Sequence, residues 1–290
     1  MNHIKGKSTR PISNTPPRRH RVNWHEAAAC AIEIDLRDYA DMLQFLSEYI
    51  LGKNSYRIDF LVIRKLSGQT IPRNIARIFR TYNLFEFKGL HSSLTVSTYH
   101  KVIRYAGLFI NQLSGMDSKQ YSSLDISISF LTFRCPRKLL RHLTEERNLA
   151  VEKFSKGIYY INIETFRIQI IVTRELPPDE NLYLHCLTNN LQNVSLIDRL
   201  ANDCALHQGE DVYRKYLDQL TAANATMKGE HTMVSEGLLN LFGTSSAEII
   251  ANTRKESEAK INEQAETIKQ LSFQNNYLKE LLRKNNISFE

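Results

Sequence analysis

The sequence predicts an α/β fold, in which strands and helices alternate up to about residue 176 and helices alone follow. Short apolar segments rich in β-branched and aromatic residues, typical of buried strands, recur between residues 56 and 176. Between them lie segments whose apolar residues recur every three or four positions, as in amphipathic helices. After Pro177 the strand signals stop. With 290 residues, 42% of them hydrophobic, the chain is long enough for one main domain with appendages.

Residues 1–23 differ in composition from the rest of the chain. They contain six Lys and Arg residues, among them Arg18, Arg19 and Arg21, no acidic residue, and three of the seven prolines. Six of the seven excess positive charges therefore lie in this segment. The composition predicts a disordered basic arm that would bind phosphate backbones. A solubilising leader or an upstream start-site artefact would have the same composition.

The next segments predict helices and then two buried strands. From Trp24 to Ile50 the apolar residues keep three-to-four spacing, which predicts one or two amphipathic helices, and Gly52 ends them. Residues 56–65 (YRIDFLVIRK) and residues 83–89 (NLFEFKG) are short, branched and aromatic, and predict strands.

Residues 95–113 predict a long amphipathic helix. Ser97 or Thr98 would be its N-cap, and Lys101 and Arg104 lie toward its polar side. The elements expected after this helix are a strand at 124–134, a short helix at 136–146, a hairpin at 157–176, and short helices at 196–206 and 211–227.

The C-terminal 40 residues predict a coiled coil. Residues 251–290 contain no Gly or Pro and carry just over three heptads, with Ile261, Ile268, Asn275 and Leu282 at the a positions. A coiled coil would make the chain a homodimer, whereas a single helix packed on its own domain is the alternative. The expected division is 1–23 basic arm, 24–176 core domain, 177–250 helical region and 251–290 coiled coil.

The sequence lacks the motifs of several functional classes. The four cysteines form no CxxC pair and the nine histidines show no HxxxH or HExxH spacing, so we expect no metal site built on them. No run of about 18 apolar residues occurs, and the N-terminus lacks the apolar region of a secretory signal. We therefore expect a cytoplasmic protein that does not associate with a membrane. No P-loop, GxSxG or GxGxxG motif is present, which disfavours NTP-using and serine-nucleophile enzymes.

Two of the predicted strands carry charged residues inside apolar runs. In NLFEFKG, Phe85 and Phe87 point to one face of the strand, so Glu86 and Lys88 share the other. Asp59 is likewise flanked by apolar residues, an expensive place for an uncompensated charge. A divalent cation would compensate both carboxylates. A buried ion pair from Lys88 to Asp59 or Glu86, or the polar rim of a half-buried sheet, would do so without chemistry.

The order of these residues resembles a known nuclease pattern. Asp59 is followed, after 26 residues, by Glu-x-Lys at the end of an apolar strand, with a helix and another strand behind it. This resembles the PD-(D/E)XK nuclease superfamily, whose restriction-endonuclease-like core is a mixed β-sheet flanked by helices. The transposase-like branch, bacterial proteins allied to recombination-promoting nucleases, is similar over residues 24–176. The segments that carry the resemblance are WHEAAACAIEIDL, RIDFLVIRK, IARIFRTYNLFEFKG, VSTYHKVIRYAGLF, GIYYI and IQIIVTREL.

The resemblance implies a Mg²⁺-dependent DNA endonuclease, with Mn²⁺ as an alternative metal. Asp59 and Glu86 would hold the metal with help from the backbone carbonyl of Phe87, and Lys88 would orient or deprotonate the attacking water. Glu33 matches the acid that many members place on the first core helix and would complete the catalytic set. Hydrolysis would leave a 5′ phosphate and a 3′ hydroxyl.

Other positions match the family less specifically. Glu26 lies about two helical turns before Glu33 and could substitute for it, although ordinary helix-surface acids are the simpler account of both. Lys101 and Arg104 would contact DNA phosphates, with solvated side chains as the alternative. Gln169 matches the IQI of the family, but a buried Gln bonded to the backbone explains it as well. The chain departs from the family at GLHSSL, where relatives commonly carry Ser-Pro and an acid-containing loop.

Two functions therefore compete. The first is a Mg²⁺-dependent DNA endonuclease, dimeric through residues 251–290 and linked to a mobile element or to recombination by the resemblance alone. The second is a weakly active or inactive nuclease-fold protein that binds DNA or assembles complexes through its basic arm and coiled coil. The choice between DNA and RNA, and any sequence preference, stay open.

Overall fold

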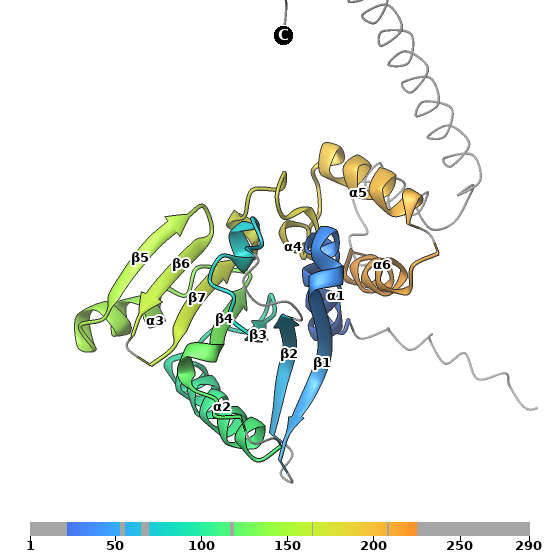
Figure 1. Cartoon of the computed structure of the whole chain (residues 1–290). Coiled ribbons are helices and arrows are strands. Elements are labelled where there is room, and N and C mark those ends of the chain that lie inside the picture. The colour runs from blue at the N-terminus through green and yellow to red at the C-terminus, as the bar shows by residue number, and fades with distance from the viewer. Residues whose placement is uncertain are drawn as a thin grey trace, which may run out of the picture.

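The computed structural model describes residues 22–52, 56–64, 70–116, 119–163, 165–207 and 209–224. In this part of the chain a mixed sheet of seven strands runs in the order β1-β2-β3-β4-β7-β6-β5 (Figure 1), which confirms the α/β class. The strands are β1 (Leu43–Leu51), β2 (Tyr56–Arg64), β3 (Tyr82–Lys88), β4 (Ile126–Thr132), β5 (Ala150–Ser155), β6 (Ile158–Asn162) and β7 (Arg167–Val172). The helices are α1 (Trp24–Asp35), α2 (Val96–Ser114), α3 (Arg137–Arg141), α4 (Leu182–His185), α5 (Val194–Leu206) and α6 (Asp211–Asn224).

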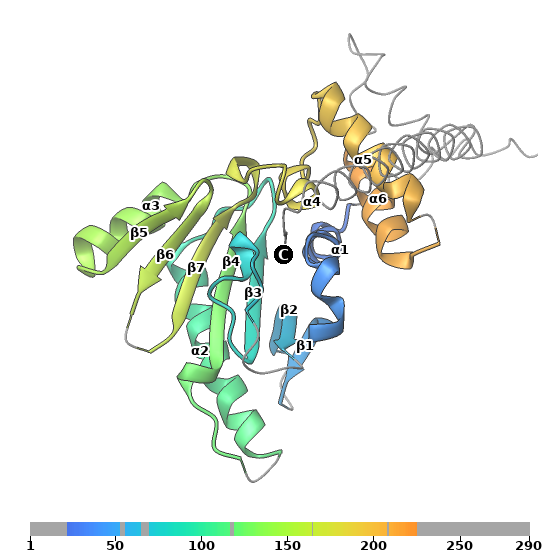
Figure 2. The ribbon, with the colours of Figure 1, turned by 45° about the horizontal axis from the view of Figure 1, so that its top comes forward.

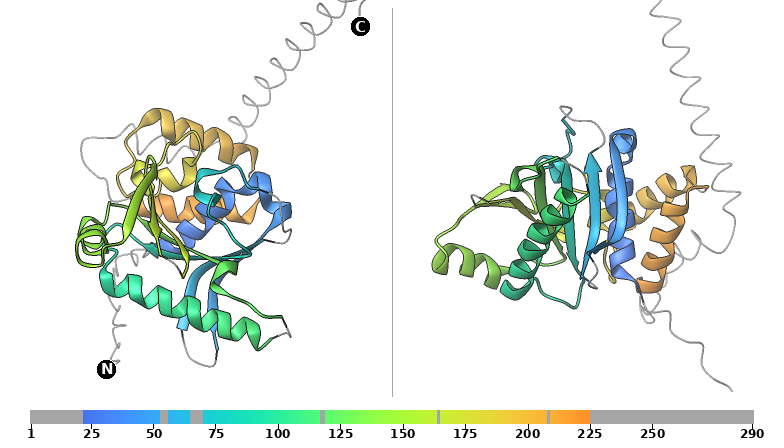
Figure 3. Two further views of the ribbon diagram at one scale, coloured as in Figure 1. Left: turned by 60° about the vertical axis from the view of Figure 1, so that its left-hand side comes forward. Right: turned by 60° about the horizontal axis from the view of Figure 1, so that its bottom comes forward.

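The sheet combines an antiparallel and a parallel part. β1, β2 and β3 are antiparallel neighbours, β3, β4 and β7 run parallel, and β6 and β5 extend the other edge antiparallel. α2 connects the parallel strands β3 and β4 and, with α3, covers one face of the sheet, while α1, α4, α5 and α6 lie on the other (Figure 3). α1 lies between the sheet and α6 (Figure 2), which explains why almost its whole circumference is buried. The two faces bury separate hydrophobic cores.

The main correction concerns residues 36–50, for which the sequence predicted helix. α1 ends at Asp35, a 3-10 turn covers Arg37–Met42, and Leu43–Leu51 is the edge strand β1. Glu48 adopts a left-handed backbone with φ of 51°, which interrupts the two-residue alternation of the strand. Apolar residues on either side of this irregularity fall three or four positions apart, so the strand has the periodicity of a helix.

The other expected elements form within a few residues of their predicted bounds, including the hairpin of β6 and β7 and the helices α5 and α6. The predicted N-cap of α2 is wrong. Thr95 caps this helix, and its Oγ1 accepts a hydrogen bond from the Thr98 N–H at 3.2 Å. β5 has no counterpart among the predicted strands, because AVEKFS is an edge segment with exposed charges and no apolar run.

Two predictions fall outside the described residues. The basic arm, with Arg18, Arg19 and Arg21, and the coiled coil of 251–290 therefore stay predictions. Among the helices described, none has both the length and the apolar character needed to cross a membrane.

Candidate active site

The candidate site lies where β2 and β3 separate. The two strands pair from Ile63–Tyr82 to Phe60–Phe85, and the pairing stops before it reaches Asp59 and Glu86. Beyond that point the Phe87 N–H donates to Asp59 Oδ2 at 2.9 Å. The Asp59 carboxylate thus takes the place of a strand carbonyl and joins β2 to β3 past their last backbone pair.

Glu86 is buried with two ammonium groups against the same oxygen. Only 2% of its surface is exposed. Lys88 and Lys101 both donate to Glu86 Oε1, at 2.7 and 2.8 Å. Phe85 and Phe87 pack in the opposite core, which confirms the predicted orientation of β3. The ion pair between Lys88 and Glu86, one of the alternatives weighed from the sequence, is therefore present, and the helix α2 adds a second cation.

Asp59 has a further partner in His25, at the start of α1. His25 Nδ1 lies 3.2 Å from Asp59 Oδ2, and its ring packs edge-on against Phe87 with centroids 5.9 Å apart. The hydrogen bond to Asp59 raises the pKa of His25 in spite of burial. Burial alone would raise the pKa of Asp59, but the hydrogen bonds from His25 and the Phe87 N–H, with the charges of His25 and Lys88, lower it overall. Asp59 is therefore ionised at neutral pH.

A pocket of about 550 Å³ opens beside Asp59. Residues of α1, β1, β2 and α6 line it, and five of them are acidic: Glu26, Glu33, Glu48, Asp59 and Asp211. The structure thus brings both first-helix acids into the same pocket as Asp59. Burial raises the pKa of Glu33, against the charge of Lys215. Glu26 accepts a hydrogen bond from Gln219 Nε2 at 2.9 Å, which is a structural role.

Two residues of the site were missed in the sequence. His25 reaches Asp59 from α1, a contact for which no local pattern exists. Glu48 stands opposite Asp59 in the register of β1 and β2, between the pairs Ser47–Phe60 and Tyr49–Ile58. It would have been found only with β1 recognised as a strand, and its left-handed backbone is a strained conformation of the kind that often occurs at functional sites.

The remaining predicted residues divide between the site and the scaffold. Lys101 belongs to the site; burial would lower its pKa, but the hydrogen bond and charge of Glu86 raise it overall. Arg104 is exposed on α2. Gln169 is fully buried and donates to the Ile75 carbonyl at 2.7 Å and to Ser129 Oγ at 2.8 Å, which supports the simpler structural account.

Asp59 and Glu86 offer the carboxylate oxygens that hard divalent cations prefer. Across the residues described, no group of three or more His, Cys, Asp or Glu side chains is arranged to hold a metal. Two carboxylates and a backbone carbonyl make a smaller protein set, which Mg²⁺ commonly completes with waters. The hydrogen bonds and ion pairs of the site engage only Oδ2 of Asp59 and Oε1 of Glu86. One oxygen of each carboxylate is thereby left as a candidate ligand.

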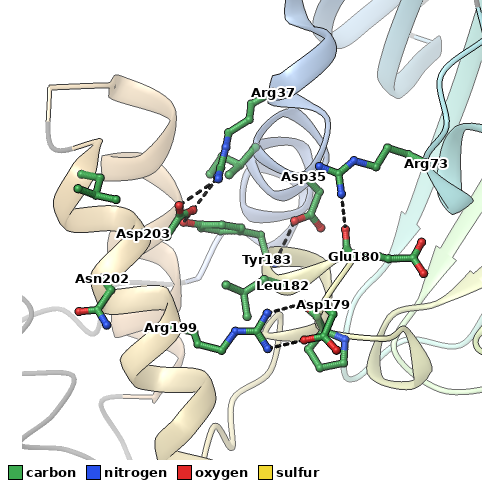
Figure 4. A pocket seen from close by; sticks show the side chains of 13 residues that line it. Asp35, Arg37, Arg73, Asp179, Glu180, Leu182, Tyr183, Arg199, Asn202 and Asp203 are labelled. Atoms are coloured by element: carbon green, nitrogen blue, oxygen red, sulfur yellow. Dashed lines mark hydrogen bonds and ion pairs between the residues drawn. The ribbon is translucent and has the colours of Figure 1, made fainter. Parts of the chain in front are cut away.

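A second pocket, of about 410 Å³, lies away from these residues between α1, α4 and α5 (Figure 4). Its arginines are already paired: Arg37 with Asp203 at 2.6 Å, Arg199 with Asp179 at 2.9 Å, and Arg73 with Asp38. Buried Asp35 accepts the N–H groups of Tyr183 and Leu184, and so ties α1 to α4. These contacts hold together the helices around this pocket.

Comparisons of the chain with family models, with curated proteins and with solved structures found no match.

Proposed function

We propose that this chain is a Mg²⁺-dependent endonuclease of the PD-(D/E)XK type, which hydrolyses phosphodiester bonds in DNA. The observation that carries the proposal is the meeting of Asp59, Glu86 and Lys88 at the point where β2 and β3 part, with the Phe87 N–H bonded to Asp59. The order α1, β1, β2, β3, α2, β4, with β3 and β4 parallel across α2, supports a restriction-endonuclease-like core.

Each residue of the site has a separate task in this proposal. Asp59 and Glu86 would hold Mg²⁺ or Mn²⁺, with the Phe87 carbonyl as a third ligand. The bound metal would supply Lewis acidity and lower the pKa of the attacking water. The Phe87 N–H and His25 fix Oδ2 of Asp59, and so orient its other oxygen. Lys88, whose side chain is 19% exposed, would orient the attacking water as an ammonium, or accept its proton as the neutral amine.

The second candidate is a nuclease-fold protein that binds DNA or assembles complexes without cutting. The observation in its favour is the double neutralisation of Glu86 by Lys88 and Lys101, which satisfies the buried charge with no metal. A role in mobile elements or recombination, and a homodimer built through residues 251–290, are proposals that rest on the family resemblance and the heptad pattern.

A plasmid assay distinguishes the two candidates. Wild type, Asp59→Asn, Lys88→Met and the exposed control Lys138→Met are incubated with supercoiled plasmid and Mg²⁺, Mn²⁺ or EDTA. We expect metal-dependent nicking by wild type and Lys138→Met, and a loss of about 100-fold or more in the other two, because each removes a group that acts on the reacting atoms. Cleavage that persists in Asp59→Asn would refute the site. Inertness of wild type with every metal, with salt-sensitive DNA binding, would favour the second candidate.

A further inference from the structure

Arginines gather at the end of the sheet opposite Glu86 and Lys88. Arg167 is the first residue of β7, and Arg80 lies just before β3. Because these strands run parallel, both residues lie at the end of the sheet where the strands begin. Arg64, the last residue of the antiparallel strand β2, donates its N–H to Thr81 O at 2.9 Å and so lies at the same end of the sheet. Arg77 precedes Arg80 in the segment that enters β3. We call Arg77, Arg80 and Arg167 the arginine patch.

The charges of the arginine patch are not balanced by described carboxylates. None of its three guanidinium groups forms an ion pair within the described ranges, whereas other arginines, such as Arg37, Arg73 and Arg199, do. Burial and then the charges of Arg167 and Arg64 lower the pKa of Arg80, so these like charges act on one another. In the same part of the chain, buried Arg80 Nε has no hydrogen-bond acceptor. Guanidinium groups that share one end of the sheet and have no described carboxylate partner favour the binding of an anion there.

Aromatic rings border the arginine patch. The Arg77 guanidinium lies over the Phe154 ring, 4.9 Å from its centroid. Phe154 is itself stacked on Tyr160 with ring centroids 4.6 Å apart. Burial raises the pKa of Tyr160, and the nearby charges of Arg77 and Arg167 act to lower it, so its ring lies near both arginines. Glu152 stands opposite Tyr160 on β5.

A row of buried polar side chains holds the arginine-bearing segment on the sheet. Asn83 accepts the Arg80 N–H at 2.7 Å and donates to the Arg80 carbonyl at 3.0 Å. Ser127 donates to Asn83 Oδ1 at 2.7 Å, and Gln169 donates to the Ile75 carbonyl at 2.7 Å. All three side chains are fully buried. Because buried polar groups are costly unless paired, this row specifies one position for residues 75–80.

We infer that the arginine patch binds the phosphate backbone of a nucleic acid, as a second contact surface distant from the catalytic residues. Arg80 and Arg167 stand two strands apart, about 10 Å at the usual strand spacing. Guanidinium groups spread over that distance suit successive phosphates better than one small anion. Arg64 lies five positions after Asp59 along β2, about 17 Å of strand, so one duplex could contact both places. The choice of nucleic acid among polyanions rests on the proposed function.

The test is DNA binding by the full chain in EDTA, where no cleavage occurs. Affinity for a fluorescein-labelled 20-base-pair duplex is measured by anisotropy from 50 to 400 mM NaCl. Arg77→Gln/Arg167→Gln is compared with Arg137→Gln/Arg141→Gln, an equal charge change at exposed positions of α3. We expect the patch variant to lose about 1.8 units of salt slope, from two phosphate contacts at about 0.9 each, and at least tenfold in affinity at 0.1 M salt. The control variant should change less than twofold.

Other outcomes overturn the inference. Equal losses in the two double variants would mean that net charge alone matters, and no DNA binding by wild type would remove the patch as a nucleic-acid surface. Displacement of the duplex by polyglutamate at the same charge concentration as by unlabelled DNA would make the partner an acidic protein. The two proposals fail separately. A selective loss of DNA binding in the patch variant, with no plasmid cleavage by wild type, would refute only the nuclease. Plasmid cleavage by wild type, with no selective loss of binding in the patch variant, would refute only the patch.

Discussion

The two lysines on one oxygen of Glu86 predict a strongly non-additive stability cycle. Glu86 is 2% exposed and accepts from Lys88 and Lys101 at 2.7 and 2.8 Å. A charge-assisted hydrogen bond contributes about 1.5–3 kcal/mol, but one lysine still neutralises Glu86 when the other is removed. We therefore expect Lys88→Met or Lys101→Met alone to lower the free energy of unfolding by about 1 kcal/mol; for Lys101, 35% exposed, solvent also screens the pair. The double variant leaves the carboxylate buried without a cation, which costs about 3–5 kcal/mol.

Urea unfolding at pH 7, followed by circular dichroism, measures this cycle on wild type, the two single variants and the double variant. Methionine keeps most of the lysine stem, so packing changes little. Lys138→Met, on exposed α3, is the control and should change stability by less than about 0.5 kcal/mol. The expected coupling is about 2 kcal/mol. A double loss equal to the sum of the single losses within about 0.5 kcal/mol would refute the shared neutralisation of Glu86.

Three further predictions concern Asp35, His25 and Gly157. Burial raises the pKa of Asp35 to about 7, so the folded chain binds this proton more tightly than the unfolded chain and stability falls from about pH 4 to pH 7. Asp35→Asn should flatten that fall in urea unfolding between pH 5 and 8, and an unchanged slope would contradict it. The pKa of Asp59 is lowered and that of His25 is raised, so between about pH 4 and 6.5 Asp59 is ionised and His25 is protonated. His25→Gln should lower the free energy of unfolding by less than about 1 kcal/mol, chiefly in that pH range. A difference that grows above pH 8 would be inconsistent with the pair. Gly157 has φ of 80°, and a Cβ there would lie 2.9 Å from backbone atoms. Gly157→Ala should therefore lower the free energy of unfolding by more than about 2 kcal/mol, seen as a lower melting temperature. Gly107→Ala, at an open position of α2, should not lower it.

The strand that carries Glu86 and Lys88 could be predicted because its signal is local. Phe85 and Phe87 alternate with the two charged residues, and this pattern alone determines which side chains share a face. The helix α2 could be predicted for the same reason, since its apolar positions recur over five turns without interruption. The predicted strand at 56–65 corresponds to β2 and placed Asp59 correctly beside the apolar core.

The partners of these charges could not be predicted, because they come from distant parts of the chain. Lys101 was expected to face phosphate or solvent, and its contact with Glu86 depends on how α2 lies on the sheet. His25 meets Asp59 only after α1 packs on the sheet. Strand β1 was not predicted, because the backbone at Glu48 breaks the alternation that identifies strands. For that reason Glu48 was not predicted to lie opposite Asp59.

The most direct test of the proposed metal site is Mn²⁺ binding measured by electron paramagnetic resonance, because it needs no knowledge of the DNA substrate. Wild type is titrated beside Asp59→Asn, Glu86→Gln and Glu145→Gln, the last an exposed acid that pairs weakly with Arg141 at 3.9 Å. We expect one Mn²⁺ per chain in wild type and in Glu145→Gln, and its loss in the other two. Equal Mn²⁺ binding by all four proteins, or none by wild type, would contradict a metal centre built from Asp59 and Glu86.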